Sequence, residues 1–234
     1  MTLFLVGLGV SCDITLSGLE AIQTADNVYI ETYTNPLDEE TIQNLEKKTG
    51  KKFEKLERDK LESSFLVNQA KSSNVCVLIS GDPLTATTHV TLVVEAKQKN
   101  IPVQVIHNSS IYSTAPARSG LQIYRFGKTA SLVNPRPNYK PVSSLDIIRE
   151  NLTRNLHTLV LLDTEPQPME AKVALEMLSE FETAVVLSCV GHKDEKIVFG
   201  KVKNLIGIEL GKPPFTLIIP AKLHHIEEEY LNLF

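Results

Sequence analysis

The 234-residue chain has no tryptophan, few cysteines and no long apolar run. Its three cysteines, Cys12, Cys76 and Cys189, are far apart and form no CxxC pair, which argues against a disulfide framework and favours a reducing compartment. No stretch approaches the roughly 18 apolar residues that cross a membrane, and no signal-peptide pattern follows Met1. We therefore expect a cytoplasmic protein that has no membrane partner.

The chain also lacks an excess of positive charge. Its formal net charge is -4 and its pI is about 5.9, so it has no overall basic field for binding nucleic acid. Lysines do gather at residues 47–55, but Glu46, Glu54 and Glu57 are interleaved with them, which is typical of a solvated helix face. Nucleic acid is therefore not an expected partner.

The composition is that of an ordinary globular protein, with 42% hydrophobic and 22% charged residues. In the first half, helices alternate with continuous apolar strands, as parallel sheets buried on both faces require. The second half has many short strands, which favours a mixed sheet. We predict an α/β protein with a mostly parallel N-terminal domain, residues 1–112, and a C-terminal domain with a mixed sheet, residues 113–234.

The expected elements follow from apolar periodicity and from turn residues. In the first half we expect strands at residues 3–6, 28–30, 75–79 and 103–106, and helices at 17–25, 37–48 and 88–99. Asp13 or Thr15 caps the first helix. In the second half we expect strands at 122–125, 130–133, 157–163, 184–190, 197–200 and 215–219, and helices at 144–155 and 168–180.

Ligands in open α/β sheets bind outside the carboxyl ends of the strands. This rule selects four loops, at residues 7–11, 81–89, 107–112 and 163–168. The first loop begins like a dinucleotide-binding fingerprint, but Cys12 stands where the third glycine belongs. A nicotinamide cofactor is therefore weakly supported, and a tight glycine turn explains the pattern equally well.

The loop at residues 81–89, with the sequence GDPLTATTH, carries the densest set of polar side chains. Asp82 fits two roles equally well, as an acceptor for a ligand amine or hydroxyl and as the cap of a following turn. Its threonines and His89 lie over the start of a helix, where capping needs one or two of them. Residues 107–112 add a second polar loop, and we expect two neighbouring parallel strands to deliver both loops into one crevice.

The histidines suggest neither a metal site nor a hydrolase. His107 and His157 are associated with strands and are more typical of structural histidines, while His224 and His225 are adjacent and do not share a helix face. The chain lacks the GxSxG elbow of serine hydrolases. We therefore expect no metal ion.

Several motifs together resemble a known family. They are LFLVGLGV, DITLSGLEAI, VYIETYT, ISGDPLTATTH, VIHNSSIYS, SGLQIYRFGKT, NLHTLVLLD and EEEYLNLF. On these motifs, which run nearly end to end, the chain resembles the diphthine synthases, the diphthamide-pathway methyltransferases of the tetrapyrrole-methylase superfamily. The resemblance implies a homodimer of two-domain subunits, with S-adenosylmethionine in a cleft between the domains and elongation factor 2 as the protein substrate. In that substrate the family methylates a modified histidine.

The resemblance also implies which residues contact the cofactor. A sulfonium methyl group is already activated, so the reaction needs a positioned nucleophile more than a catalytic acid or base, and no catalytic residue is assigned. Carried over position by position, the cofactor contacts are Val10, Asp82, Thr85, Ser110, Ile111, Leu162, Val190 and Phe215.

Two departures from the family pattern leave questions open. Residues 164–169 are short where eukaryotic relatives carry a longer basic insertion, which leaves recognition of the protein substrate and the number of methyl groups undecided. Arg118 stands in a segment that is usually lined by small residues. Two other functions are alternatives: a superfamily methyltransferase acting on a porphyrin or corrin precursor, and a cofactor-binding module without catalysis. The continuations ATTH and HNSSIYS argue against the first of these.

Overall fold

The computed structural model describes residues 1–33, 37–136, 142–165 and 167–234. The chain divides into two compact units, Met1–Ser110 and Ile111–Phe234. This division falls two residues before the boundary that the sequence suggests. One residue of the short stretch at 164–169, residue 166, lies outside the described residues.

The first unit is built on a five-stranded parallel sheet with the order β3-β2-β4-β1-β5. The sequence prediction of a parallel N-terminal sheet is confirmed, although it missed the short edge strand β3. The strands are β1 (Leu3–Gly7), β2 (Asn27–Glu31), β3 (Glu54–Leu56), β4 (Val75–Ile79) and β5 (Val103–Ile106), and the helices are α1 (Leu16–Thr24), α2 (Glu39–Thr49), α3 (Arg58–Leu61), α4 (Phe65–Gln69) and α5 (Val90–Gln98).

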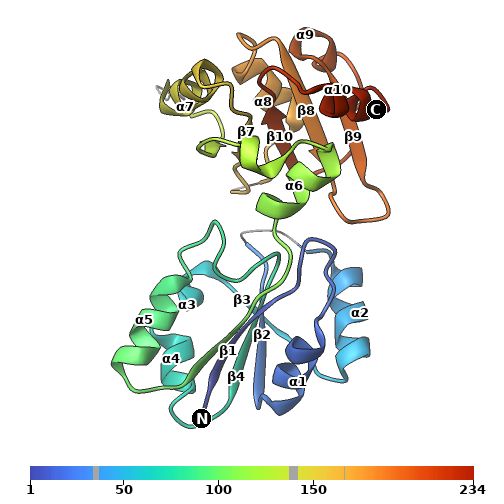
Figure 1. Cartoon of the computed structure of the whole chain (residues 1–234). Coiled ribbons are helices and arrows are strands. Elements are labelled where there is room, and N and C mark those ends of the chain that lie inside the picture. Colours follow the sequence, from blue (N-terminus) through green and yellow to red (C-terminus); the bar gives the residue numbers. More distant parts are fainter. Residues whose placement is uncertain (34–36, 137–141, 166) are drawn as a thin grey trace. The chain divides into compact units, whose positions relative to one another are not determined.

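Helices cover both faces of this sheet, and the alternation of side chains along each strand explains why (Figure 1). Leu3 and Leu5 of β1 pack into one core with α3, α4 and α5, whereas Phe4 and Val6 pack into the other core with α1 and α2. Each fully buried side chain of this size contributes about 1.5–3 kcal/mol. Because both faces are buried, β1 and β4 are apolar along their whole length, as the sequence indicates.

The helix ends of the first unit follow local sequence signals. Thr15, one of the two predicted caps, accepts a hydrogen bond from the backbone N–H of Gly18 at 3.0 Å and begins α1. Asp38 caps α2 in the same way at 2.7 Å, and Gly50 ends that helix in the left-handed conformation. Capping residues therefore set the boundaries that periodicity alone placed one or two residues away.

The second unit contains a mixed five-stranded sheet with the order β6-β7-β10-β8-β9, in which β6 and β7 are parallel and the other pairs are antiparallel. This confirms the predicted mixed sheet. The strands are β6 (Ala130–Leu132), β7 (Thr158–Leu162), β8 (Thr183–Ser188), β9 (Lys196–Lys201) and β10 (Phe215–Ile219), and the helices are α6 (Ile111–Ser119), α7 (Val142–Thr153), α8 (Ala171–Met177), α9 (Val202–Leu205) and α10 (His225–Leu231).

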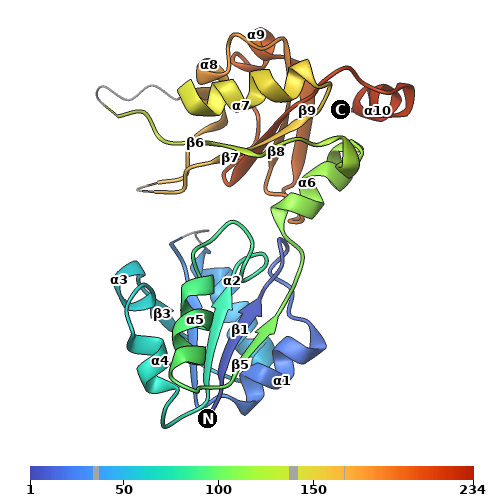
Figure 2. The ribbon, with the colours of Figure 1, turned by 60° about the vertical axis from the view of Figure 1, so that its left-hand side comes forward.

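Each face of the second sheet has its own core. Helices α7, α8 and α9 cover one face (Figure 2), where Val160, Val186 and Leu217 are buried. Residues of α6 and α10 pack with the other face, which presents Leu159 and Val185. Both α6 and α10 were missed from the sequence, since their apolar residues do not repeat with a clear helical period.

One predicted strand of the second half is wrong. Residues 122–125 do not join the sheet, because Ile123–Arg125 forms a short 3-10 helix, η1. Its backbone is held by the end of the chain instead: the N–H of Gln122 donates to Oε1 of Glu227 in α10 at 3.1 Å. Glu227 lies more than 100 positions along the chain from Gln122, and this long-range hydrogen bond outweighs the local preference for a strand.

A buried polar network joins α10 to η1 and to His157, the residue before β7. The side chains of Glu227 and His157 are fully buried, and Oε1 of Glu227 lies 3.3 Å from Nε2 of His157. The carboxylate also accepts hydrogen bonds from Nη1 of Arg125, from the N–H of Gln122 and, at 2.8 Å, from the N–H of His224. Burial raises the pKa of Glu227, but these hydrogen bonds and the Arg125 charge outweigh it and hold the pKa below its usual value.

The same network predicts a loss of stability at acidic pH. Burial lowers the pKa of His157, and its Nδ1 accepts a hydrogen bond from the N–H of Ala221 at 2.9 Å, so the ring is neutral in the folded state. Because the pKa values of His157 and Glu227 are both lower than in the unfolded chain, the unfolded state binds more protons as the pH falls. We expect the free energy of unfolding of the second unit to decrease from about pH 6.5 downward and to fall further once carboxylates titrate. Denaturant titrations between about pH 7 and 4 measure this, and a flat profile would contradict it.

Candidate functional site

Three loops of the first unit meet at the carboxyl ends of β1, β4 and β5. The loops after β1 and β4 are joined directly, because Gly9 and Gly81 exchange two backbone hydrogen bonds of 3.0 Å. The two polar loops at residues 81–89 and 107–112 also meet as expected, since Nδ1 of His107 lies 2.7 Å from Oδ2 of Asp82, but the predicted cause of this convergence is wrong. Strands β4 and β5 are not neighbours; β1 lies between them, and its loop links the other two.

Glycine permits this close contact. A Cβ atom on Gly7 would lie 2.6 Å from the carbonyl oxygen of Gly81 and 2.9 Å from Cδ of Pro83, both closer than such contacts allow. Asn108 completes the junction, since its side-chain amide donates to the carbonyl oxygen of Gly7 at 3.0 Å and to that of Asp13 at 2.9 Å. Gly9 has φ +66°, which only glycine adopts readily. The glycines of the fingerprint-like segment therefore serve loop packing.

Asp82 organises the loop after β4 from a buried position. Its Oδ1 accepts hydrogen bonds of 3.0 Å from the N–H of Leu84 and from Oγ1 of Thr85, so the turn-capping role is present. Its Oδ2 accepts a hydrogen bond of 2.7 Å from Nδ1 of His107. Burial raises the pKa of Asp82, but the bonds from Leu84, His107 and Thr85 lower it by more, and the carboxyl group is ionised. A carboxylate has about four acceptor positions, so this one retains an acceptor position for a ligand.

The two histidines of these loops, His107 and His89, differ in their surroundings. The His107 side chain is 66% exposed, and its Nδ1 lies 2.7 Å from Oδ2 of Asp82. His89 is 2% exposed, and its Nδ1 lies 3.1 Å from the carbonyl oxygen of Pro83. Burial lowers the pKa of His89, which makes it a neutral structural residue beneath the loop.

The remaining candidates of the first unit lie on the loops after β1 and β5. The N–H of Val10 donates to Oγ of Ser109 at 3.2 Å, which holds the first loop against the third. Val10 and Ser110 are both half-buried, and Ser110 is the last residue of the first unit. The structure thus brings Val10, Asp82, Thr85 and Ser110 to one edge of the first sheet.

The candidates Leu162, Val190 and Phe215 gather at one edge of the second sheet. Leu162 ends β7, Phe215 begins the antiparallel neighbour β10, and Val190 follows β8 two residues after its last residue, Ser188. Phe215 pairs with Ser188 in register. Val190 and Phe215 are buried, and Leu162 and Ile111, the first residue of the second unit, are half-buried. These four residues present apolar surface and no charge.

Arg118 has a structural explanation. Its Nε donates to Oε1 of Glu195 at 2.8 Å, and Oε2 of the same glutamate accepts the N–H of Gly191 at 2.8 Å. The arginine therefore orients a carboxylate that holds the backbone next to Val190. A small residue at position 118 would leave Glu195 without this partner.

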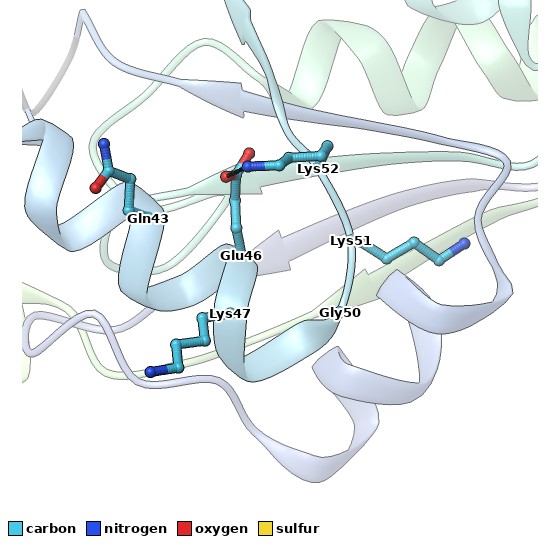
Figure 3. A pocket seen from close by; sticks show the side chains of 6 residues that line it. All are labelled: Gln43, Glu46, Lys47, Gly50, Lys51 and Lys52. Carbon is cyan, nitrogen blue, oxygen red and sulfur yellow. Dashed lines mark hydrogen bonds and ion pairs between the residues drawn. The ribbon is translucent and has the colours of Figure 1, made fainter.

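The lysine-rich stretch forms a separate hollow of about 470 Å³ on the first unit, lined by Gln43, Glu46, Lys47, Gly50, Lys51 and Lys52 (Figure 3). Nζ of Lys52 donates to Glu46 at 2.6 Å, and Nζ of Lys51 donates to the carbonyl oxygen of Ala25 at 2.8 Å. Ala25 lies two residues before β2, so the hollow lies at the amino ends of the strands, opposite the three loops. Its charges are largely satisfied within the chain, as expected for a solvated surface.

Two buried cysteines are unreactive. Burial raises the pKa of Cys12 to about 11 and that of Cys76 to about 12, so neither thiol is a nucleophile at neutral pH. Within residues 1–33, 37–136, 142–165 and 167–234, no three His, Cys, Asp or Glu side chains are arranged to hold a metal ion. Over the same ranges, no helix has the length and apolar character to span a membrane.

Comparison with known proteins assigns the family. Residues 2–206 match the Tetrapyrrole (Corrin/Porphyrin) Methylases. A diphthine synthase from Methanocaldococcus jannaschii is 41% identical, with 98% of this chain and 97% of that protein covered. The chain belongs to the diphthine synthase family. This family membership makes it a methyltransferase, and the alternative of a binding module without catalysis is not supported.

Solved structures agree with this family assignment. A crystal structure of a diphthine synthase matches with a TM-score of 0.92 and 36% identity, covering 100% of this chain and 96% of the other. A putative diphthine synthase from Entamoeba histolytica matches with a TM-score of 0.88 and 35% identity, covering 100% and 98%. The two-sheet α/β architecture is therefore that of the diphthine synthase family.

Proposed function

We propose that this methyltransferase uses S-adenosylmethionine to methylate the modified histidine of elongation factor 2 during diphthamide biosynthesis. The observation that carries the proposal is the joined set of loops at the carboxyl ends of β1, β4 and β5, where ligands of parallel sheets bind. Near full-length similarity to diphthine synthases supports the choice of methyl donor and of protein substrate.

The residues at these loops fit such a methyl donor. Space is open beside Gly81, because a Cβ atom added there would have the Ser109 carbonyl oxygen as its nearest neighbour, at 3.9 Å. A ligand therefore has access to the Gly81 backbone. Asp82 would accept from the donor's amino or hydroxyl groups, and Val10, Thr85 and Ser110 would line the same position. S-adenosylmethionine supplies a methyl group that is already activated as a sulfonium, so the protein's part is to position the nucleophile and exclude water.

The candidates of the second unit are proposed contacts of the methyl donor on the family resemblance. Ile111, Leu162, Val190 and Phe215 offer side chains without charge, and Arg118 through Glu195 holds the backbone beside Val190. By the same family reasoning we infer that the enzyme acts in the cytoplasm as a homodimer.

The test is methyl transfer from labelled S-adenosylmethionine to elongation factor 2 that carries the unmethylated intermediate. Label on that protein supports the proposal, and its mass gives the number of methyl groups. A parallel reaction with a porphyrin or corrin precursor serves as the competing arm. Transfer to the precursor and not to the elongation factor would replace the proposed substrate.

Replacing Asp82 by alanine is expected to weaken binding of the methyl donor about tenfold or more, equivalent to about 1.4 kcal/mol. The change removes both a charged acceptor and the group that orders Leu84, Thr85 and His107. Titration calorimetry with S-adenosylmethionine measures the affinity, and Asp59→Ala, an exposed substitution on α3, is the control. Unchanged affinity for the Asp82 variant would remove Asp82 from the donor site.

A further inference from the structure

Methylation of an amine leaves a proton that has to be removed. As the nitrogen lone pair forms the new N–C bond, the donor's C–S bond breaks and its electron pair stays on sulfur. The methylated nitrogen then carries a positive charge and a surplus proton. Until that proton leaves, the nitrogen has no lone pair for a second methyl group. Methylation of a carboxylate releases no proton, so the requirement concerns nitrogen alone.

We propose that His107, oriented by Asp82, is the acceptor of this proton. The inference rests on the proposed function, since it assumes that an amine is the nucleophile. It uses a residue that the family resemblance leaves unassigned. The juxtaposition that carries it is an exposed imidazole held 2.7 Å from a buried carboxylate, on the loop after β5 and beside the proposed donor site.

The carboxylate fixes which ring nitrogen is available. An ionised carboxylate only accepts hydrogen bonds, so Nδ1 of His107 carries the hydrogen and donates it to Oδ2 of Asp82. In the neutral ring, Nε2 is then the nitrogen with a free lone pair. Asp82 is 9% exposed and anchored by Leu84 and Thr85, so it holds the ring from a rigid base.

The position of His107 also suits an acceptor that exchanges protons with water. Its side chain is 66% exposed, while the carboxylate behind it is buried. His89, the other histidine of these loops, is buried and directs Nδ1 to the backbone of Pro83, so it is not available for this role. The step is balanced: the N–H bond of the methylated ammonium breaks, Nε2 of His107 gains the proton, and the imidazolium returns it to solvent.

The decisive variant is His107→Asn, because its amide preserves a donor toward Asp82 but has no basic nitrogen. We expect unchanged affinity for S-adenosylmethionine by calorimetry and a turnover on the elongation factor 2 intermediate that is about 100-fold lower. Added imidazole should restore part of the rate, since the site is open to solvent. His107→Gln should behave in the same way, and His225→Asn, an exposed histidine on α10, should leave turnover unchanged.

The outcomes separate this inference from the proposed function. If the wild-type enzyme methylates the intermediate, the proposed function stands. In that case the role of His107 is overturned if the His107→Asn variant is equally fast, or if it is slow and imidazole does not restore its rate. A variant whose rate loss is explained by weaker donor binding does the same, because it makes His107 a binding residue. A wild-type enzyme that transfers no methyl group to the intermediate removes both proposals.

Discussion

Replacing Glu227 by alanine is expected to lower the free energy of unfolding of the second unit by about 3–5 kcal/mol, the range for breaking a buried ion pair from one side. The carboxylate receives hydrogen bonds from the backbone of Gln122 and His224 and from the side chains of His157 and Arg125. Alanine would leave these donors without their acceptor in a region where water does not reach them. A loss of this size is a large fraction of the stability of a typical domain.

Chemical denaturation followed by far-UV circular dichroism measures this loss. Glu229→Ala is a matched control, since Glu229 is exposed on the same helix, two residues further along. The control is expected to change the unfolding free energy by about 0.5 kcal/mol or less. Equal stability of the two variants would show that the buried carboxylate is not what holds α10 to η1.

Replacing Gly7 by alanine is expected to reduce methyl transfer by about 100-fold, as a displacement of about 1 Å at a reacting centre can do. The new Cβ would collide with the backbone of Gly81 and with Pro83, neither of which is a flexible side chain. The loops after β1 and β4 would separate, and Asp82 would move with the second of them. Overpacking of this kind also lowers stability by about 1–3 kcal/mol.

Turnover and donor affinity, measured together with thermal unfolding, distinguish these two effects. Gly207→Ala is the control, because a Cβ there meets only the Asn204 carbonyl oxygen, at 3.7 Å, which is an ordinary contact. The Gly7→Ala variant should keep this loss of about 100-fold at temperatures at which it is still folded. If its activity falls only in parallel with unfolding, the loop junction is not part of the site.

Much of the fold could be predicted because its strands are buried on both faces. Strands β4, β5 and β10 were placed with their observed bounds, since continuous apolar runs between polar turns mark them clearly. The elements that were missed or misassigned have weaker local signals. Strand β3 is an edge strand of three residues, and η1 takes its conformation from the partner Glu227 on α10.

The site was predictable in part. The strand-end rule selected the loops that contain Gly7, Asp82 and His107, and the turn-capping role of Asp82 was one of two open alternatives. Local sequence does not determine the order of strands in a sheet, so the place of β1 between β4 and β5 could not be predicted. The burial of a side chain depends on tertiary packing, so sequence did not show that His107 is exposed and paired with Asp82 while His89 is buried.

The place of β1 between β4 and β5 connects ligand binding to the folding of the whole unit. The three loops come from residues about 100 positions apart and meet only after β5 and β4 have both paired with β1. A ligand that contacts all three would bind the folded unit and not the unfolded chain, and at 100 times its Kd it would add about 2.7 kcal/mol to stability. Amide hydrogen exchange should then slow throughout the strands of this sheet, and not just in the loops that the ligand contacts.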